Sequence, residues 1–317
     1  MKLQGDFCNY LFYRKEGAVI LSRGKKISKL KDDSKWAWTM LLPNIIGFVL
    51  FMLVPVVATF VLSFTKYDML TSPKFIGLQN YIDLVKDPIV REVTKNTIVY
   101  TVLTVPVGMC LSLLLAVMLD QKIGSRRFYR AAFFLPSITS MVVVAIVWQW
   151  IYNPDYGLLN YFLSLFGIQG PKWLLDAKTS LLSLAIVGIW KSAGYNMIIF
   201  LSGLQGISTS YYEAAELDGA SKWAQFRYIT VPMLKPTTFF IFIMSIISSF
   251  QVFDQVMLMT KGGPGRSSSV LVHYLYQNAF QYFKLGYACA IAYLLFFIVM
   301  IITAINMRME KSMREIY

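Results

Sequence analysis

The stretch EAAELDGASKWAQFRYITVPMLKP, residues 213–236, is a polar island between two long apolar runs. Three polar residues before it, Ser208, Thr209 and Ser210, supply oxygens that can cap the start of a helix. Glu213 and Glu216 follow in the early turns, where the helix dipole favours negative charge. A glycine, residue 219, is suited to end the run. The island therefore predicts a short capped helix over about residues 211–217.

The composition around the island indicates a membrane protein. Apolar residues make up 56% of the 317-residue chain and aromatic residues 15%, more than soluble domains usually carry. A bilayer core about 30 Å thick needs about 20 apolar residues of helix. Six runs reach that length: Thr39–Phe64, Thr97–Leu119, Ala131–Tyr152, Ser180–Leu204, Thr237–Met259 and Leu285–Met307. The sequence thus predicts an all-α membrane protein with six transmembrane helices.

Prolines inside these runs agree with membrane helices. Pro43, Pro55, Pro106 and Pro136 lie within the runs or at their ends. In a membrane bundle, neighbouring helices can satisfy the backbone groups that a proline leaves free. The prolines therefore argue against soluble core helices.

The distribution of basic residues predicts the orientation. Six spans place both termini on one side, together with the loop near 120–130 and the stretch 205–236. That side carries nineteen of the thirty lysines and arginines, the other side carries ten, and Lys191 lies inside a span. The positive-inside rule then places both termini and the island in the cytoplasm. Residues 1–37 become a cytoplasmic arm, 38–310 the six-helix domain and 311–317 a cytoplasmic tail.

The excess of lysine and arginine over aspartate and glutamate does not indicate nucleic-acid binding. The excess charge gathers at membrane edges rather than along one soluble face, so lipid headgroups explain it better. We expect contact with membrane lipid and no nucleic-acid partner.

The sequence offers little for catalysis. It has no G-x-x-x-x-G-K-[ST] loop to hold ATP phosphates, and its single histidine, His273, leaves no pair for a metal. Cys8, Cys110 and Cys289 fall in the arm and in two spans, so they form no disulfide framework or metal cluster. We expect no enzymatic activity, no metal and no cofactor in this chain.

The island resembles the signature of a known family. Glu213-Ala214-Ala215, three residues, Gly219, nine residues, Ile229, one residue, Val231 and Pro232 reproduce the E-A-A-x3-G-x9-I-x-L-P pattern of ABC importer permeases, with valine in place of leucine. Gly203-Leu204-Gln205 before it and Thr260-Lys261-Gly262-Gly263-Pro264 after it look like the carbohydrate-uptake branch, typified by maltose and glycerol-3-phosphate permeases. The resemblance covers roughly residues 39–310.

The resemblance implies a function for the island. In such importers, which have the type I ABC importer fold, this segment is a coupling helix between the fourth and fifth spans, seated in a groove of a separate ATPase. The implied ATPase-coupling residues here are Glu213, Ala214, Ala215, Asp218, Gly219 and Pro232. A capped helix with an acid and small residues suits such docking.

The resemblance also implies the assembly: a second homologous permease, as a heterodimer, two ATPase subunits that bind ATP and Mg, and an extracytoplasmic solute-binding protein. The expected place is a bacterial inner membrane, and the expected activity is import of a sugar or oligosaccharide by alternating access.

Polar residues within two spans predict the substrate path. Gln251, Asp254 and Gln255 interrupt the fifth run and, in a continuous helix, share one face. Polar groups in hydrocarbon are costly unless they face protein or water, so this face should look inward. The fourth run has a similar interruption at Trp190, Lys191, Tyr195 and Asn196. Amide, carboxylate and aromatic groups suit a sugar, although Lys191 and Asp254 could instead pair across helices to hold the bundle together.

Two other functions remain open at this stage. One is an ABC permease for another solute, such as glycerol-3-phosphate. The other is a stand-alone channel or secondary carrier, which should show internal repeats or an intramembrane charge relay; the sequence shows neither.

Overall fold

The computed structural model describes residues 23–121 and 124–314, with side chains from 36 to 121 and from 124 to 308. Cys8 and most of the expected arm and tail lie outside these residues. The chain divides into two compact units, Met1–Thr59 and Phe60–Tyr317, and each is described by itself.

The first unit contains a long helix with a local irregularity before a proline. Helix α1 (Arg23–Phe48) continues through a π-turn, η1 (Val49–Leu53), into α2 (Val54–Ser63). The N–H of Val54 donates to the carbonyl of Val49, five residues back. The next residue, Pro55, has no N–H to give, so a wider turn accommodates it without ending the helix. Residues Trp36–Ser63 are long and apolar enough to cross a membrane.

The second unit is helical apart from a two-residue hairpin, β1 (Thr65–Lys66) and β2 (Lys74–Phe75), in which Thr65 lies opposite Phe75. Its helices and turns are α3 (Gln79–Lys86), α4 (Pro88–Asp120), α5 (Arg126–Ile138), α6 (Met141–Ile151), α7 (Leu158–Leu165), η2 (Trp173–Leu175), α8 (Ser180–Gln205), α9 (Thr209–Leu217), α10 (Lys222–Gln225), η3 (Phe226–Thr230), α11 (Val231–Met233), α12 (Lys235–Phe250), α13 (Asp254–Met259), α14 (Leu271–Tyr276), η4 (Gln277–Gln281) and α15 (Leu285–Arg314).

Helices α4 and α8 form the centre of this unit and pack along their lengths. Ala116 and Leu119 of α4 are buried against Phe200 and Leu201 of α8 in one core cluster. Helix α5 also packs on α8. A Cβ at Gly194 of α8 would lie 1.9 Å from the carbonyl oxygen of Phe133, so only glycine permits this close approach.

Two of the six expected spans are not continuous helices. The third, Ala131–Tyr152, breaks after Ile138 into α5 and α6, which are bent by 99°. Pro136 removes one backbone donor just before this break. The fifth, Thr237–Met259, ends at Phe250 and resumes as α13 at Asp254. Near that end, the Ser249 hydroxyl donates to the carbonyl of Ile246, 2.8 Å away, and serine side chains of this kind compete with helix hydrogen bonds.

The other expected spans are found as single helices. Pro88–Asp120, Ser180–Gln205 and Leu285–Arg308 are each long and apolar enough to cross a membrane, as is Trp36–Ser63, most of which belongs to the first unit. The bent pairs, α5 with α6 and Lys222–Met233 with Lys235–Phe250, raise the number of candidate spans from 4 to as many as 6.

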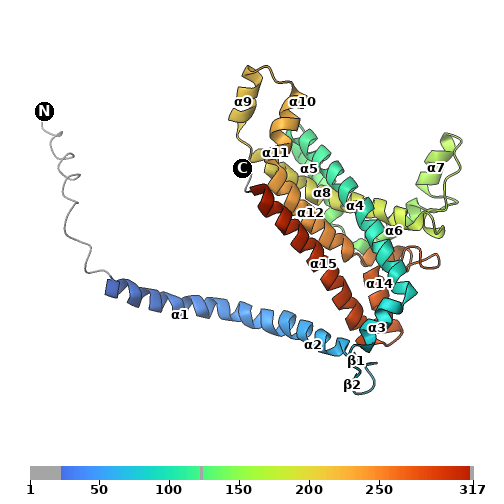
Figure 1. Cartoon of the computed structure of the whole chain (residues 1–317). Helices are drawn as coiled ribbons and strands as arrows, with labels where there is room; N and C mark the ends of the chain where they lie inside the picture. Colours follow the sequence, from blue (N-terminus) through green and yellow to red (C-terminus); the bar gives the residue numbers. More distant parts are fainter. Residues whose placement is uncertain (1–22, 122–123, 315–317) are drawn as a thin grey trace. The chain divides into compact units, whose positions relative to one another are not determined.

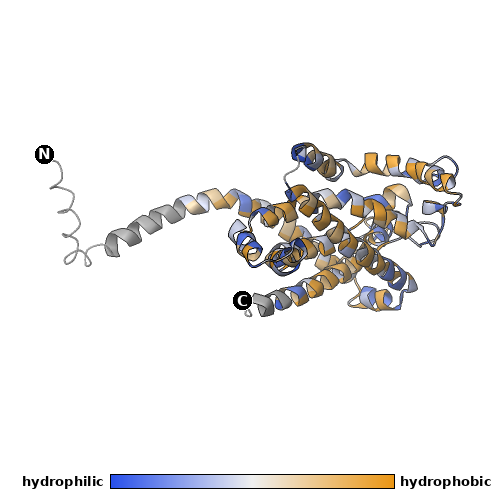
Figure 2. Ribbon diagram, turned by 90° about the horizontal axis from the view of Figure 1, so that it is seen from above, coloured by the Kyte–Doolittle hydropathy of each residue, from blue (hydrophilic) through white to orange (hydrophobic). Residues whose placement is uncertain are grey.

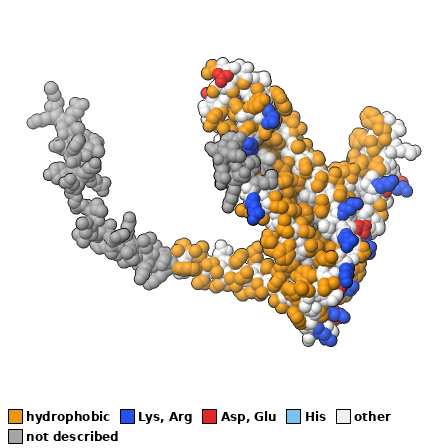
Figure 3. All heavy atoms as spheres, viewed as in Figure 1, with side chains coloured by type: hydrophobic (Ala, Val, Ile, Leu, Met, Phe, Trp, Pro, Cys, Tyr) orange, Lys and Arg blue, Asp and Glu red, His pale blue; other side chains and the backbone are white. Residues whose placement is uncertain are grey.

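Polar elements gather at the two ends of the second unit. Figure 1 shows α9 and α10 at one end and α3, β1 and β2 at the other. The long helices between them are mostly hydrophobic in Figure 2, with hydrophilic residues near their ends and connections. In Figure 3, acidic and basic side chains both lie near the α9 end and along the edge that leads to the opposite end. An apolar band thus separates two polar ends.

Candidate functional site

A cavity of about 680 Å³ lies where both helix breaks meet the central helices. Its lining comes from α4, α5, α6, α8, α12, α13 and the residues 251–253 between the last two. Volumes of this size hold small organic ligands. Of the predicted path residues, five line the cavity: Tyr195, Asn196, Gln251, Asp254 and Gln255. The sixth, Trp190, does not line it; its ring packs edge-on against Trp148, with 5.5 Å between centroids.

Lys191 stabilises the first break. Its ammonium donates to the carbonyl oxygens of Thr139, at 2.6 Å, and Pro136, at 3.2 Å. These carbonyls lie at the end of α5, where backbone N–H donors run out: Pro136 accepts only from the N–H of Thr139, 3.3 Å away. A cation at a helix C-terminus is also favoured by the helix dipole. The alternative in which Lys191 and Asp254 pair across helices is not found, because no salt bridge joins them and the lysine bonds backbone instead.

The second break places its polar residues differently. Gln251 follows the last residue of α12, and Asp254 is the first residue of α13. The two therefore do not share one face of a continuous helix, as the sequence predicted, but both line the cavity. Among the side chains that the structure describes, Asp254 has neither a hydrogen bond nor an ion-pair partner, and it is exposed. Its carboxylate is free to accept hydrogen bonds from a ligand.

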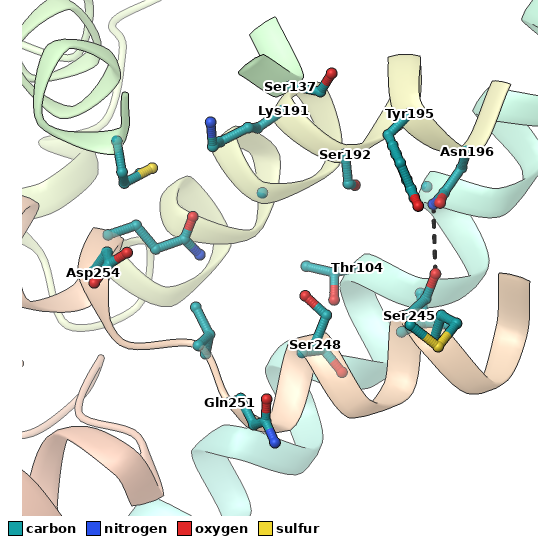
Figure 4. A pocket seen from close by; sticks show the side chains of 18 of the residues that line it. Thr104, Ser137, Lys191, Ser192, Tyr195, Asn196, Ser245, Ser248, Gln251 and Asp254 are labelled. Carbon is teal, nitrogen blue, oxygen red and sulfur yellow. Dashed lines mark hydrogen bonds between the residues drawn. The ribbon is translucent and has the colours of Figure 1, made fainter. Parts of the chain in front are cut away.

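The remaining polar groups are held by hydrogen bonds between helices. Gln255 of α13 donates through Nε2 to the hydroxyl of Tyr100 on α4. Asn196 of α8 donates to the Ser245 hydroxyl of α12 across 3.4 Å, shown as a dashed line in Figure 4. Both amide side chains are buried. The cavity wall is therefore fixed by contacts between helices.

Hydroxyl groups in the lining were not predicted as site residues. Figure 4 shows Thr104, Ser137, Ser192 and Ser248 around the same space as Asp254 and Gln251. Thr104 donates to the carbonyl of Tyr100 and Ser137 to that of Phe134. Single serines and threonines are common in membrane helices because they bond to their own backbone in this way. The sequence therefore gave no signal that separated these from packing residues.

The island forms the expected short helix at one end of the unit. Ser208 caps α9 by accepting a hydrogen bond from the N–H of Ser210. After α9, Gly219 has φ +77°, the N–H of Ala220 bonds the carbonyl of Ala215 at 2.8 Å, and that of Gly219 bonds Glu216 at 3.0 Å. These two bonds form a Schellman motif, in which the left-handed residue is usually glycine.

The two glutamates of α9 differ in their partners. Glu216 forms a salt bridge with Lys222, and this hydrogen bond lowers the pKa of the Glu216 carboxyl. Glu213 is exposed and has no ion-pair partner within the described part of the chain. Ala214 next to it is exposed as well, as are Asp218 and Gly219, whereas Ala215 and Pro232 are half-buried. The island thus presents two acids without a salt bridge among the described residues, Glu213 beside small residues and Asp218 at the turn.

Neighbouring contacts fix α9 to the segment before α12. The hydroxyls of Tyr212 in α9 and Thr230 in η3 are 2.9 Å apart. The turn η3 precedes Pro232, and the N–H of Val231 reaches back five residues to Phe226. This is the same arrangement as at Pro55 in the first unit. The helix α9 is therefore attached to the helical segment that continues into α12.

The predicted unreactive residues have ordinary roles in the structure. His273 is buried, and its Nδ1 lies 2.9 Å from the Ser269 hydroxyl; burial lowers the pKa of its ring. Cys110 and Cys289 are free thiols. Within the described residues, no group of three metal-ligating side chains could hold a metal ion.

Comparison with known proteins identifies the family. Residues 98–314 match the family model described as binding-protein-dependent transport system inner membrane component. The chain belongs to this family. One relative is the probable ABC transporter permease YurN of Bacillus subtilis (strain 168), 36% identical over 88% of this chain and 97% of the relative. Another is the arabinooligosaccharides permease AraP of the same organism, 32% identical over 86% and 87%.

A solved structure shares the fold of this inner membrane component. A bacterial ABC transporter involved in the import of the acidic polysaccharide alginate has a chain with TM-score 0.80 and 24% identity, covering 90% of this chain and 99% of its own. The predicted all-α ABC permease fold is therefore confirmed. The chain is a transport component rather than an enzyme, and a stand-alone channel or carrier is excluded.

Proposed function

We propose that this permease carries a sugar or oligosaccharide through the cavity at the two helix breaks. The lining supports this, because hydroxyl, amide and carboxylate groups from Ser248, Asn196, Gln251 and Asp254 converge on one space. Sugars are bound through hydroxyl hydrogen bonds, and Tyr195 adds an aromatic face. The arabinooligosaccharides transported by the relative AraP agree with this class of cargo. Another solute is the alternative.

The helix α9 is proposed to dock on a separate ATPase subunit that binds ATP and Mg. Glu213 would meet a basic residue there, because Glu216 is already neutralised by Lys222 within this chain. Ala214 and Ala215 allow close seating, Asp218 and Gly219 form the turn, and Pro232 begins the segment that leads to α12. Attachment through Tyr212 and Thr230 would pass motion from α9 toward the cavity.

The proposed assembly contains a second, homologous permease, two ATPase subunits and an extracytoplasmic binding protein. The orientation follows from charge: residues 1–37 and 311–317 lie in the cytoplasm, 38–310 form the membrane domain, and α9 is cytoplasmic. The location of α9 and α3 at opposite ends of the second unit agrees with this orientation.

The coupling role is tested with two α9 variants in reconstituted complexes. Glu213→Lys reverses an unpaired acid and should abolish sugar uptake and the ATPase activity that the binding protein stimulates, because it leaves two cations facing each other. Glu216→Gln, the matched control, removes only an exposed pair within the chain and should retain most uptake. Wild-type uptake and ATPase activity in Glu213→Lys would disprove the docking of α9.

The substrate path is tested in the same complexes. Gln251→Ala and Tyr195→Ala should each reduce uptake, while the complex still assembles with its ATPase. Trp190→Ala is the matched control, because its ring lies outside the cavity lining. Unchanged uptake in both cavity variants would assign those residues to packing.

A further inference from the structure

We propose that the cavity selects saccharides without negative charge and that Asp254 is the residue that rejects anionic cargo. This inference rests on the proposed sugar path and adds the charge class of the substrate. It follows from a difference between the two ionic side chains in the lining: Lys191 is hydrogen-bonded to the backbone, and Asp254 has no hydrogen bond or salt bridge within the described residues.

Most of the hydrogen-bonding capacity of Lys191 is used at the helix break. Two of its three ammonium donors already bond the carbonyls of Thr139 and Pro136. Turning toward a cargo carboxylate would leave the Thr139 carbonyl without a partner and the Pro136 carbonyl with only the backbone N–H of Thr139, 3.3 Å away. Unpaired backbone groups are costly in a membrane. The positive charge also offsets the negative end of the α5 dipole. Its position is therefore explained by the helix break.

Asp254 makes no hydrogen bond and no salt bridge with the described side chains. It is exposed to the cavity from the first turn of α13, and in Figure 4 it lies on the same side as Lys191. A carboxylate accepts hydrogen bonds and donates none. It therefore binds sugar hydroxyls or an ammonium group well and repels a second carboxylate or a phosphate.

The rest of the lining carries no charge that would change this preference. Apart from Lys191 and Asp254, the described residues that line the cavity are neutral. Hydroxyls such as Ser248 and Thr104 and the amide of Gln251 bond neutral and charged sugars alike. Discrimination by charge therefore depends on Asp254.

The charge of the cavity is measured without any sugar. In the assembled transporter with Cys8, Cys110 and Cys289 replaced by serine, Ser248→Cys places a thiol in the lining. The rate at which this thiol reacts with a methanethiosulfonate that bears a quaternary ammonium is compared with its rate with the analogue that bears a sulfonate. Each rate is divided by the rate at which the same reagent reacts with a small thiol free in solution. We expect the cationic reagent to be favoured by about tenfold.

Two variants assign that preference to its source. Asp254→Asn in the Ser248→Cys background should bring the ratio of rates close to that of the free thiol. Asp155→Asn removes an exposed carboxylate outside the cavity lining and should leave the ratio unchanged. A wild-type ratio at or below that of the free thiol would overturn the inference.

A pair of sugars then tests the substrate class. The probes are a neutral galactose disaccharide and the disaccharide in which both C6 carbons are carboxylates, bound to the permease–ATPase complex without binding protein. We expect the neutral probe to bind about tenfold tighter and Asp254→Asn to remove most of that difference. Tighter binding of the acidic probe would overturn the inference. If neither sugar binds while the reagent ratio stays high, the proposed sugar path fails and the charge assignment of Asp254 stands.

Discussion

The two helix breaks at the cavity are alike in position but differ in how their polar groups are satisfied. At the break between α5 and α6, Lys191 supplies donors to the carbonyls that the bend exposes. At the break between α12 and α13, Gln251 and Asp254 face the cavity, and the carboxylate has no partner in the described chain. The protein satisfies the first break itself and leaves acceptors at the second.

This difference distinguishes polar residues that stabilise the fold from polar residues that are available to a ligand. Both Lys191 and Asp254 are charged residues in apolar stretches, and such residues are functional candidates by default. Their contacts assign them to different tasks: the lysine holds a bend, and the aspartate remains available to cargo. Substitution of Lys191 should therefore lower the stability of the fold, whereas substitution of Asp254 should change the binding of cargo.

The largest expected effect on stability is that of Lys191→Met. The variant loses two charge-assisted hydrogen bonds and leaves the carbonyl of Thr139 unpaired, while that of Pro136 keeps the backbone N–H of Thr139. We expect a loss of about 2 to 3 kcal/mol in the free energy of unfolding, limited by cavity water that can replace part of the bonding. Denaturant titration of the purified protein in detergent measures it.

Asp254→Asn is the matched control for that variant. Its carboxylate has no partner in the described chain to lose, so the free energy of unfolding should change by less than about 0.5 kcal/mol. Equal destabilisation by the two substitutions would remove the distinction between the breaks.

A smaller effect is expected at Asp87, a carboxylate that, unlike Asp254, is fully engaged. It accepts hydrogen bonds of 2.8 Å from the hydroxyls of Tyr274 and Tyr287 and from the N–H of Ile89, where it caps α4. Burial raises the pKa of Asp87, but these hydrogen bonds outweigh it and the pKa is lowered below 3.8. Asp87→Asn should lose about 1 to 2 kcal/mol at neutral pH.

The pH dependence of that loss follows from the sign of the shift. Because the pKa is lower in the folded state, the carboxylate stabilises the fold fully above the unfolded value of 3.8. This contribution disappears as pH falls through the folded pKa. The difference in unfolding midpoint between wild type and Asp87→Asn should therefore shrink from pH 7 to pH 3. A difference that is constant with pH would contradict the assignment.

The smallest effect is expected at Gly219, where the helix end is closed by backbone bonds rather than by a side chain. Its φ of +77° is a conformation that an L-residue adopts at a cost. Gly219→Ala should destabilise the end of α9 by about 1 kcal/mol. Faster hydrogen exchange of the Ala220 amide reports it.

Gly206→Ala is the control for that substitution. Gly206 follows α8 with φ −80°, and a Cβ there meets nothing closer than 3.4 Å. Its exchange rates should stay close to those of the wild type. Similar effects at both glycines would show that φ is not the cause.

The sequence predicted the positions of the spans better than their continuity. Apolar runs of sufficient length located the starts of α8 and α15 to the residue. Hydropathy averaged over a span does not report the breaks after Ile138 and Phe250, because each break is only a few residues long and lies within a run that is apolar on average. Only the neighbouring helix shows why the first bend is tolerated, since its carbonyls are satisfied by Lys191, more than 50 residues along the chain.

The candidate site was predicted only in part, because its assembly also depends on the helix breaks and on the packing of neighbouring helices. Gln251 and Asp254 were found because amides and acids are rare in apolar runs. Their expected common helical face does not exist, since α12 ends before them. Trp190 shares its neighbourhood in sequence with Tyr195, but the turn of α8 directs it toward Trp148 instead. The sequence indicated which residues are unusual, and the helix packing determines which of them meet.

The attachment of α9 to the segment before α12 has a mechanical consequence. Helix α12 has 16 residues, so it is a rod about 24 Å long that begins beside α11 and ends at the second break. If its α11 end acts as a pivot, a rotation of about 10° displaces the far end by about 4 Å. That distance exceeds the length of a hydrogen bond, so a small tilt at one end of the rod is enough to make or break a hydrogen bond between Gln251 and a ligand at the other.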